Sequence, residues 1–272
     1  RGIVYRDAEG DLDVIAASDT VLATGGLGGL FKNSTNFRHL TADSLAICLR
    51  HHIELKNINY IQIHPTTFYS KKPGRRFLIS ESVRGEGAYL LNKDGERFTD
   101  ELKPRDVVTA AIRKQMEKDG TDHVYLSVTH LDGERIKKRF PNIYRQCLEE
   151  GYDMVKDWIP VTPAQHYFMG GIKVDLNSKT SMDHLYAVGE TSCNGVHGKN
   201  RLASNSLLEA LVFAKAAAKD IAKHAREIKE IEADLEAYGQ EEQLAEENRR
   251  LVLDEIKRKD REFYDQCCNE ED

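Results

Sequence analysis

Residues 185–225 combine a short apolar run, a glycine-rich loop and a long helical pattern. Leu185 to Val188 is apolar and ends at Gly189, as expected for a buried strand. Further glycines at positions 195 and 198 give a loop whose backbone can approach a ligand closely. From Ser206 onward, apolar residues recur at three- and four-residue steps. The stretch therefore predicts a strand, a loop and a helix in that order.

The start of this helix has the features of an anion site. Ser206 and Glu209 are spaced as a capping box, while Ser204 and Asn205 are alternative caps one turn earlier. A helix that follows a glycine loop directs free N–H groups and the positive end of its dipole toward that loop. Lys199 and Arg201 precede the helix. An ordinary strand–loop–helix unit with a basic loop remains the alternative interpretation.

The order of residues in GVHGKNRLASNSLLEALVF is more specific than this pattern. It resembles the C-terminal flavin-binding segment of the succinate dehydrogenase/fumarate reductase/L-aspartate oxidase flavoproteins, which carry a segment like GxHGANRLxxNSLLE. The resemblance implies FAD as the cofactor, bound in part by Glu190, Asn205, Ser206 and Leu207. The tetrapeptide ASNS, where GANS is the other form, is closer to the L-aspartate oxidase branch.

The N-terminal part of the chain predicts a hairpin followed by a glycine-rich turn. Ile3–Tyr5 and Leu12–Ala16 flank a turn-rich segment, and Asp19–Ala23 is a buried strand ended by ATGGLGG. These glycines form neither a GxGxxG fingerprint nor a P-loop, so alone they are weak evidence for a phosphate site. They resemble the family's ATGG turn, which implies that Thr24, Gly25 and Gly26 contact FAD.

The family's own GxGxxG fingerprint does not occur in residues 1–272. We therefore expect the chain to be the central and C-terminal portion of such a flavoprotein. On this interpretation the chain as given is incapable of turnover.

The middle of the chain holds the residues suited to a small dicarboxylate. A helix is predicted over Thr41–Leu55, and the strand Ile58–Ile63 delivers His64 directly before Pro65. The segments HPT, SESVRGEGA, GERF, PRDVV and HYFMGG each resemble a family motif. Arg105 begins a predicted helix, where its charge opposes the dipole, so we expect it to face a carboxylate. A local pair with Asp106 or Glu101 is the alternative.

A dicarboxylate requires cationic clamps and hydrogen-bond donors, and arginine offers the strongest bidentate contact. The chain offers Arg105 and Arg201 as clamps, with His64, Ser80 and His166 as neutral donors. The resemblance implies that Arg201 and His166 bind one carboxylate and that His64 and Ser80 bind the other. It also implies that Arg105 is the acid–base candidate. We expect Glu81 to orient Arg105 or His64.

Composition sets limits on other functions. The chain has 272 residues, 40% of them apolar and 31% charged, with a net charge of −6. A mildly acidic chain gives no reason to expect nucleic acid or a membrane surface as partner, and no apolar run approaches the roughly 20 residues of a membrane span. Five cysteines without CxxC spacing argue against a disulfide framework or a metal site. They are typical of reduced, cytoplasmic thiols.

The predicted fold class is α/β plus α+β. Residues 1–57 and 167–225 are expected to form part of a Rossmann-like FAD-binding domain. Residues 58–166, with a further strand at 121–129 and a charged helical region at 133–151, are expected to form an inserted capping domain. Residues 226–272 are expected to be a charged, solvated helical tail or a small hairpin, interrupted at Gly239.

The resulting functional expectation is FAD-dependent oxidation of L-aspartate to iminoaspartate, on the route to quinolinate and NAD. The resemblance implies fumarate or oxygen as electron acceptor and makes quinolinate synthase a candidate partner. Alternatives are a fumarate reductase or succinate dehydrogenase flavoprotein, and a non-catalytic dicarboxylate-binding fragment. A histidine-based metallohydrolase is disfavoured, because no two histidines show a ligand spacing on one element.

Overall fold

The computed structural model describes residues 1–224, 227–228, 233–235 and 241–268. The chain folds into two compact units. The first unit comprises Arg1–Lys32, His39–Ile61 and the described part of residues 167–272, and the second comprises Asn33–Arg38 and Gln62–His166. Each unit brings together segments that are distant in sequence.

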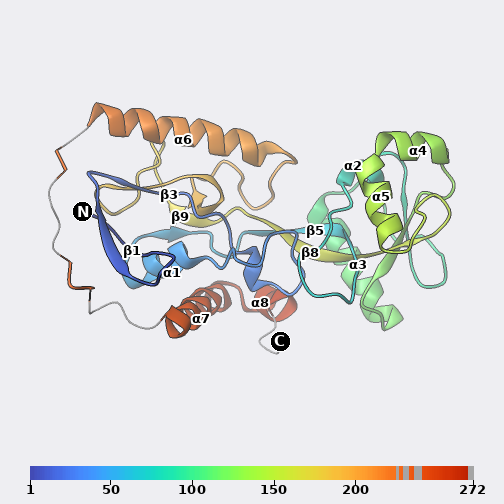
Figure 1. Cartoon of the computed structure of the whole chain (residues 1–272). Helices are drawn as coiled ribbons and strands as arrows, with labels where there is room; N and C mark the ends of the chain where they lie inside the picture. The colour runs from blue at the N-terminus through green and yellow to red at the C-terminus, as the bar shows by residue number, and fades with distance from the viewer. Residues whose placement is uncertain (225–226, 229–232, 236–240, 269–272) are drawn as a thin grey trace. The chain divides into compact units, whose positions relative to one another are not determined.

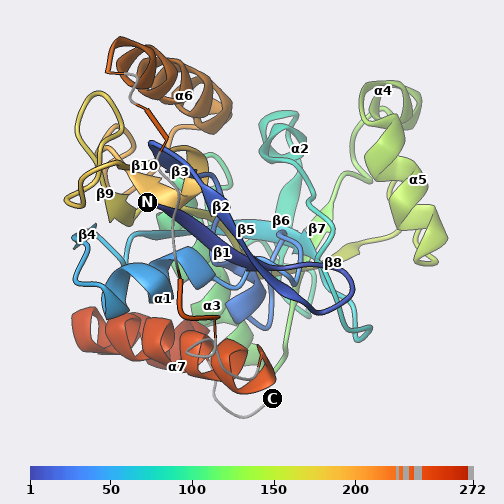
Figure 2. The ribbon, with the colours of Figure 1, turned by 60° about the vertical axis from the view of Figure 1, so that its left-hand side comes forward.

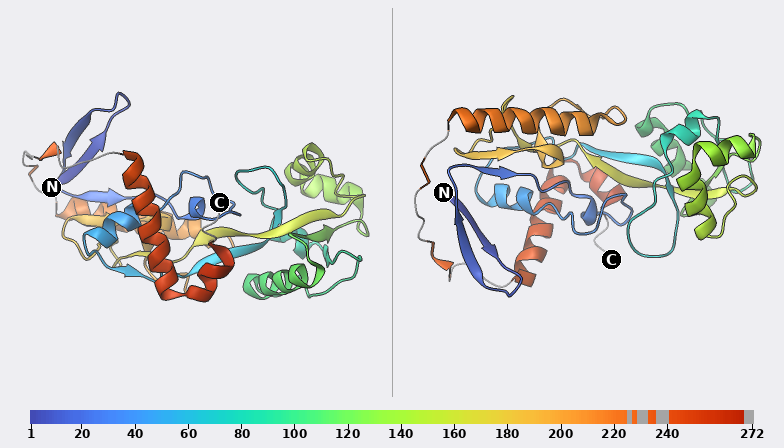
Figure 3. Two further views of the ribbon diagram at one scale, coloured as in Figure 1. Left: turned by 90° about the horizontal axis from the view of Figure 1, so that it is seen from below. Right: turned by 45° about the horizontal axis from the view of Figure 1, so that its top comes forward.

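The strands of the first unit form three small sheets. β1 (Gly2–Arg6) and β2 (Leu12–Ala16) form an antiparallel hairpin, which projects as a two-stranded ribbon in Figure 3. β3 (Thr20–Leu22) pairs in parallel with β10 (Leu185–Ala187), as a Rossmann-like arrangement requires. The third sheet has the strand order β11-β9-β4. Its strands are β4 (Leu55–Lys56), β9 (Gly171–Lys173) and β11 (Ser192–Cys193).

Helices lie on both sides of these strands within the first unit. The long helix α6 (Asn205–Lys223) runs beside β3 in Figure 1, and its Ala217 packs against Val188 and against Tyr186 of β10. On the other side lies α1 (Asp43–Arg50), which ends before the predicted Leu55. The helix stops there because His52 adopts a left-handed backbone with φ of 55°. Two short 3-10 turns, η1 (Gly28–Leu30) and η2 (Gly189–Thr191), follow β3 and β10.

The C-terminal helices are part of the first unit, which corrects the expectation of a solvated tail. α7 (Glu241–Lys259) packs against α1, and α8 (Arg261–Cys267) follows it, as Figure 2 shows for α1 and α7. Val252 and Ile256 of α7 are fully buried. The residues around Gly239, where an interruption was expected, lie outside the described residues.

The second unit is built on a four-stranded sheet with the order β5-β8-β7-β6. The strands are β5 (Ile61–Phe68), β6 (Tyr89–Leu91), β7 (Val124–Ser127) and β8 (Ile159–Phe168). β5 continues through Pro65, beyond the predicted end of the strand at Ile63. Because β5 lies at the edge of the sheet, the missing N–H of a proline is tolerated there.

Four helices accompany this sheet. They are α2 (Glu81–Gly85), α3 (Arg105–Asp119), α4 (Gly133–Arg139) and α5 (Pro141–Glu149). The single helical region predicted over residues 133–151 is two helices, because Phe140 leaves the helical conformation and Pro141 starts a new one. Side chains from the sheet and helices form one core, which includes Leu90, Val108, Ile112, Leu126 and Ile159.

Candidate functional site

Arg105, the first residue of α3, is held by one carboxylate side chain and one amide side chain in the second unit. Its Nε and one terminal nitrogen donate to Glu81 Oε2 at 2.9 and 2.7 Å, and its other terminal nitrogen donates to Gln62 Oε1 at 2.8 Å. The residue is only 9% exposed. The expected carboxylate partner is therefore Glu81, and it offsets the unfavourable interaction of Arg105 with the helix dipole.

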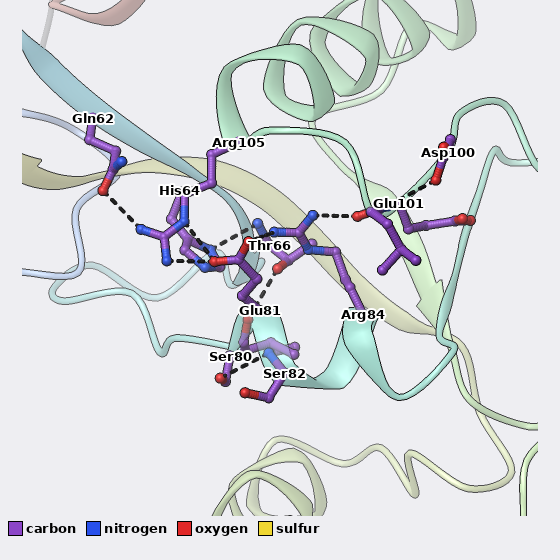
Figure 4. Close-up of polar contacts among 12 residues, drawn as sticks. Gln62, His64, Thr66, Ser80, Glu81, Ser82, Arg84, Asp100, Glu101 and Arg105 are labelled. Carbon is purple, nitrogen blue, oxygen red and sulfur yellow. Dashed lines mark hydrogen bonds and ion pairs between the residues drawn. The ribbon is translucent and has the colours of Figure 1, made fainter. Parts of the chain in front are cut away.

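Arg84 is a second arginine near Glu81, and it is buried in the core (Figure 4). It is 1% exposed, donates to the carbonyl oxygen of Glu101 at 2.6 Å, and lies 3.8 Å from Glu81. Burial, followed by the positive charge of Arg105, lowers the pKa of Arg84. Glu81 thus lies between two buried guanidinium groups, which fixes its position.

His64 lies on β5 and is almost completely buried. Its Nδ1 accepts a hydrogen bond from the backbone N–H of Thr66 at 3.2 Å, so in the neutral ring the proton resides on Nε2. Burial lowers the pKa of His64 well below its usual value, and the charges of His166, Arg105 and Arg84 act in the same direction. His64 is therefore a neutral hydrogen-bond donor.

His166 lies beside His64, on β8. The two rings are 5.2 Å apart between centroids and meet edge to face. The hydroxyl of Thr35 is 2.9 Å from His166 Nδ1. The second unit therefore brings His64, Arg105 and His166 together, although they come from three separate elements.

Ser80 caps α2 instead of standing free. Its hydroxyl oxygen accepts a hydrogen bond from the backbone N–H of Ser82 at 3.2 Å. The hydroxyl proton is not consumed by that bond, so Ser80 can still donate to a ligand.

The first unit holds the residues that were assigned to the cofactor. Three hydroxyls join the turn after β3 to the start of α1 and to η2: Thr24 lies 2.7 Å from Ser44 and 3.1 Å from Thr191, and Ser44 lies 2.8 Å from Thr191. A side chain added at Gly26 would collide with the carboxylate of Glu190. Gly25 has φ of 78°, which favours glycine.

Glu190 is a buried acceptor next to this turn. Its Oε1 accepts from the backbone N–H of Phe168 at 2.9 Å. Burial raises the pKa of Glu190 to about 7, against the opposing effects of that N–H and of Arg201. A group with this pKa is partly protonated near neutral pH, so it can accept or donate a hydrogen bond.

The N-terminus of α6 differs from the predicted capping box. The cap residue is Ser204, in a left-handed conformation with φ of 63°, and its side chain makes no capping hydrogen bond. Glu209 instead accepts from Asn194 and lies 3.9 Å from Nε2 of His197. Asn205, Ser206 and Leu207 therefore present a first turn without a side-chain cap.

Arg201 belongs to the first unit and is 6% exposed. Its guanidinium lies over the ring of Tyr167, 4.5 Å from the centroid, an arrangement that stabilises a buried cation. His197 meets the same ring edge to face at 5.5 Å. That Arg201 joins His64, Arg105 and His166 in one cleft stays a prediction.

Three residues near the predicted site were not singled out from the sequence. Gln62 precedes His64 by two residues, so strand periodicity places both on one face of β5. Arg84 follows Glu81 by three residues, a spacing that brings side chains together on a helix. No comparable signal marks Thr35, which contacts His166 from a distant segment.

Other classes of site have no support in the described part of the chain. There, no group of three or more His, Cys, Asp or Glu side chains could hold a metal ion. All five cysteines are free thiols. Within the same residues, no helix has both the length and the apolar character of a membrane span.

Known proteins similar to the chain include two curated L-aspartate oxidases. The one from Clostridium perfringens is 54% identical over 258 residues, which is 94% of this chain and 58% of that protein. The one from Clostridium acetobutylicum is 63% identical over 203 residues, which is 74% of this chain and 47% of that protein. The chain is thus a homologue of these proteins and spans about half their length.

The fold is similar to that of a solved flavoprotein. A variant of the E. coli quinol fumarate reductase superimposes with a TM-score of 0.74 at 34% identity, covering 94% of this chain and 46% of that chain. A family model described as an FAD binding domain matches residues 1–207. Because this match covers most of the chain, the chain belongs to the FAD-binding domain family.

Proposed function

We propose that the chain carries the substrate-binding residues of an FAD-dependent L-aspartate oxidase, which converts L-aspartate to iminoaspartate. Two observations support this: the identity of 54–63% to L-aspartate oxidases and the arrangement around Arg105. The proposal includes the assignment of residues 58–166 as the capping domain and of the remaining parts through residue 225 as the FAD-binding domain.

The geometry of Arg105 is the observation that carries the proposal. A guanidinium has five N–H donors, and the bonds to Glu81 and Gln62 engage three of them. Two N–H groups, one on each terminal nitrogen, are left for a ligand. A carboxylate is the group that such a pair of donors matches best.

The two histidines complete this half of the proposed site. His64 donates from Nε2 and stays neutral, so it can bind a carboxylate without a change of protonation. His166 is held by the hydroxyl of Thr35 and lies with its ring against that of His64. We assign His64 and Ser80 to one carboxylate of L-aspartate, and His166 with Arg201 to the other.

Removal of a hydride from Cα of aspartate also releases a proton from the amino group. We assign Arg105 as the residue closest to this acid–base step, on the basis of the family resemblance. A guanidinium group stays protonated in proteins, which makes arginine an unusual base. Glu81 is 42% exposed and contacts Arg105 directly, so it can pass a proton between Arg105 and solvent.

The residues of the first unit fit a flavin. Gly25 and Gly26 have no side chains of their own, and the carboxylate of Glu190 lies against Gly26 as a buried hydrogen-bonding group. The uncapped first turn of α6 offers N–H groups to an electron-rich ring edge. When bound there, FAD would accept the two electrons of the oxidation.

A fumarate reductase or succinate dehydrogenase flavoprotein is the second candidate, favoured by the TM-score of 0.74 to a quinol fumarate reductase. The same clamps would then serve succinate or fumarate. In the first candidate, quinolinate synthase is the proposed partner, as the enzyme that consumes iminoaspartate.

The test is anaerobic flavin reduction in an FAD-loaded enzyme that contains this chain together with the family's GxGxxG segment. L-Aspartate is expected to bleach the flavin, and succinate at equal concentration is not. Bleaching by succinate alone would favour the second candidate. If neither dicarboxylate binds, as judged by calorimetry, the assignment of Arg105, His64 and His166 is wrong.

A further inference from the structure

A pocket of about 460 Å³ lies in the second unit between the loop Ser70–Arg76 and the end of α5. Its volume falls within the usual range for small-molecule sites, roughly 300–1,000 Å³. Phe68, Phe77 and Leu78 supply apolar walls. A ligand of this pocket therefore needs an apolar or aromatic part.

The pocket is also positively charged. Its lining includes Lys72, Arg75 and Arg76 against a single carboxylate, Glu150, which is paired with Lys72 at 3.0 Å. With three cationic side chains and one anionic side chain, the pocket lining has a formal charge of +2, whereas the whole chain has a net charge of −6. Such a local excess of one sign attracts a ligand of the opposite sign.

The two arginines are anchored on neutral oxygens. Arg75 Nε donates to the carbonyl oxygen of Thr35 at 2.6 Å. Arg76 Nε donates to Asn33 Oδ1 at 2.8 Å, and its NH1 donates to the carbonyl oxygen of Ser70 at 2.7 Å. These bonds orient both guanidinium groups without neutralising them. Burial and the charge of Arg38 lower the pKa of Arg76, in keeping with a crowded positive site.

The anchoring segment leads directly to His166. Thr35 accepts from Arg75 with its carbonyl oxygen, and its hydroxyl lies 2.9 Å from His166 Nδ1. Its backbone N–H also donates to the carbonyl oxygen of Gln165 at 2.9 Å. Thr35 is 7% exposed, so the residue that joins Arg75 to His166 is itself packed.

We propose that this pocket binds a small organic anion, a phosphate or carboxylate attached to an apolar or aromatic group, and that occupancy is relayed through Arg75 and Thr35 to His166. The anion would contact the unengaged N–H groups of Arg75 and Arg76, and its apolar part would lie against Phe77 and Leu78. The binding step is independent of the proposed oxidase activity. The relay rests on the proposed role of His166.

The binding step is tested by calorimetry with four probes at constant ionic strength: phenyl phosphate, benzoate, inorganic phosphate and benzyl alcohol. Phenyl phosphate or benzoate is expected to bind more tightly than the last two, and the better of the two identifies the anionic group. Arg75→Gln should weaken that binding about tenfold, as expected for one charge-assisted contact. Arg145→Gln, on α5 but outside the pocket lining, removes the same charge and should have no effect.

The proposed site would be wrong if neither organic anion binds, or if the Arg75 and Arg145 variants lose the same amount of affinity.

The relay is tested by the ¹⁵N resonances of the His166 ring, which are expected to shift when the tighter probe binds. Thr35→Val keeps the carbonyl that anchors Arg75 but removes the hydroxyl. This variant should bind the probe normally and lose the shift. A shift that persists in Thr35→Val would show that the relay does not pass through Thr35.

Discussion

Arg105 illustrates how one residue depends on a partner that is distant in sequence. Its place at the start of α3 is electrostatically unfavourable, and the contact with Glu81 compensates for it. Glu81 in turn lies near Arg84, so three ionisable side chains hold one another in place. A change at any of them is expected to act on the other two.

The first prediction concerns Glu81→Gln. The variant keeps the shape of the side chain but replaces the charge-assisted bonds to Arg105 with neutral ones. In an enzyme that also contains the family's GxGxxG segment, we expect kcat/KM for L-aspartate to fall about tenfold, near the lower end for a charged hydrogen bond because Glu81 is partly exposed. Steady-state kinetics measures the effect. Glu149→Gln changes an exposed glutamate on α5 and should retain wild-type kinetics, and a similar loss in both variants would contradict the assignment.

The second prediction concerns the pH dependence of stability at His64. The folded protein holds the pKa of His64 well below that of the unfolded chain, so below about pH 6.5 only the unfolded state takes up this proton. This group therefore removes about 1.4 kcal/mol of stability for each pH unit of acidification, until the folded pKa is reached. In the variant His64→Gln, the free energy of unfolding should therefore fall less steeply as the pH is lowered.

Urea unfolding at several values between pH 5 and 8 measures this slope. His52→Gln, at an exposed position, is the matched control. If both variants change the slope equally, the effect does not come from the buried ring of His64.

At the scale of elements, α7 shows that a highly charged sequence can still form part of a core. Val252 and Ile256 are fully buried, and Arg50 of α1 bonds to Asn248. Phe263 of α8 meets Phe31 edge to face with centroids 6.4 Å apart. Through these contacts the C-terminal helices pack against α1 and against Phe31, which follows the glycine turn.

The third prediction is that Ile256→Ala lowers the free energy of unfolding by about 2–5 kcal/mol, the range for truncation of a buried isoleucine. Chemical denaturation measures the change. Leu244→Ala on the same helix is the control, since Leu244 is 47% exposed and should cost much less. Equal effects would show that α7 is not anchored through Ile256.

At the scale of the whole molecule, the division into two units predicts that each unit unfolds cooperatively by itself. Leu126 belongs to the core of the second unit and is 1% exposed. The fourth prediction is that Leu126→Ala accelerates amide hydrogen exchange in β6, β7 and β8 while β10 and α6 keep their rates. Mass spectrometry of peptides from each unit measures this. Equal acceleration in both units would show that they unfold together.

Local patterns in the sequence determined much of this protein. The hairpin β1–β2, the strands β3 and β10 and the helices α3 and α6 follow from periodicity, glycines and short motifs. These signals are local, because apolar spacing and turn residues act over a few positions of the chain. The confirmed resemblance to L-aspartate oxidases likewise came from short, ordered motifs.

Only the tertiary structure decided which of these residues meet. It assigned Glu81 and Gln62 to Arg105, placed Thr35 against His166, and turned Glu209 toward His197 instead of the helix cap. It also packed α7 against α1 and carried β5 through Pro65. The physical reason is that these outcomes depend on burial and on contacts between distant segments, which no local pattern encodes.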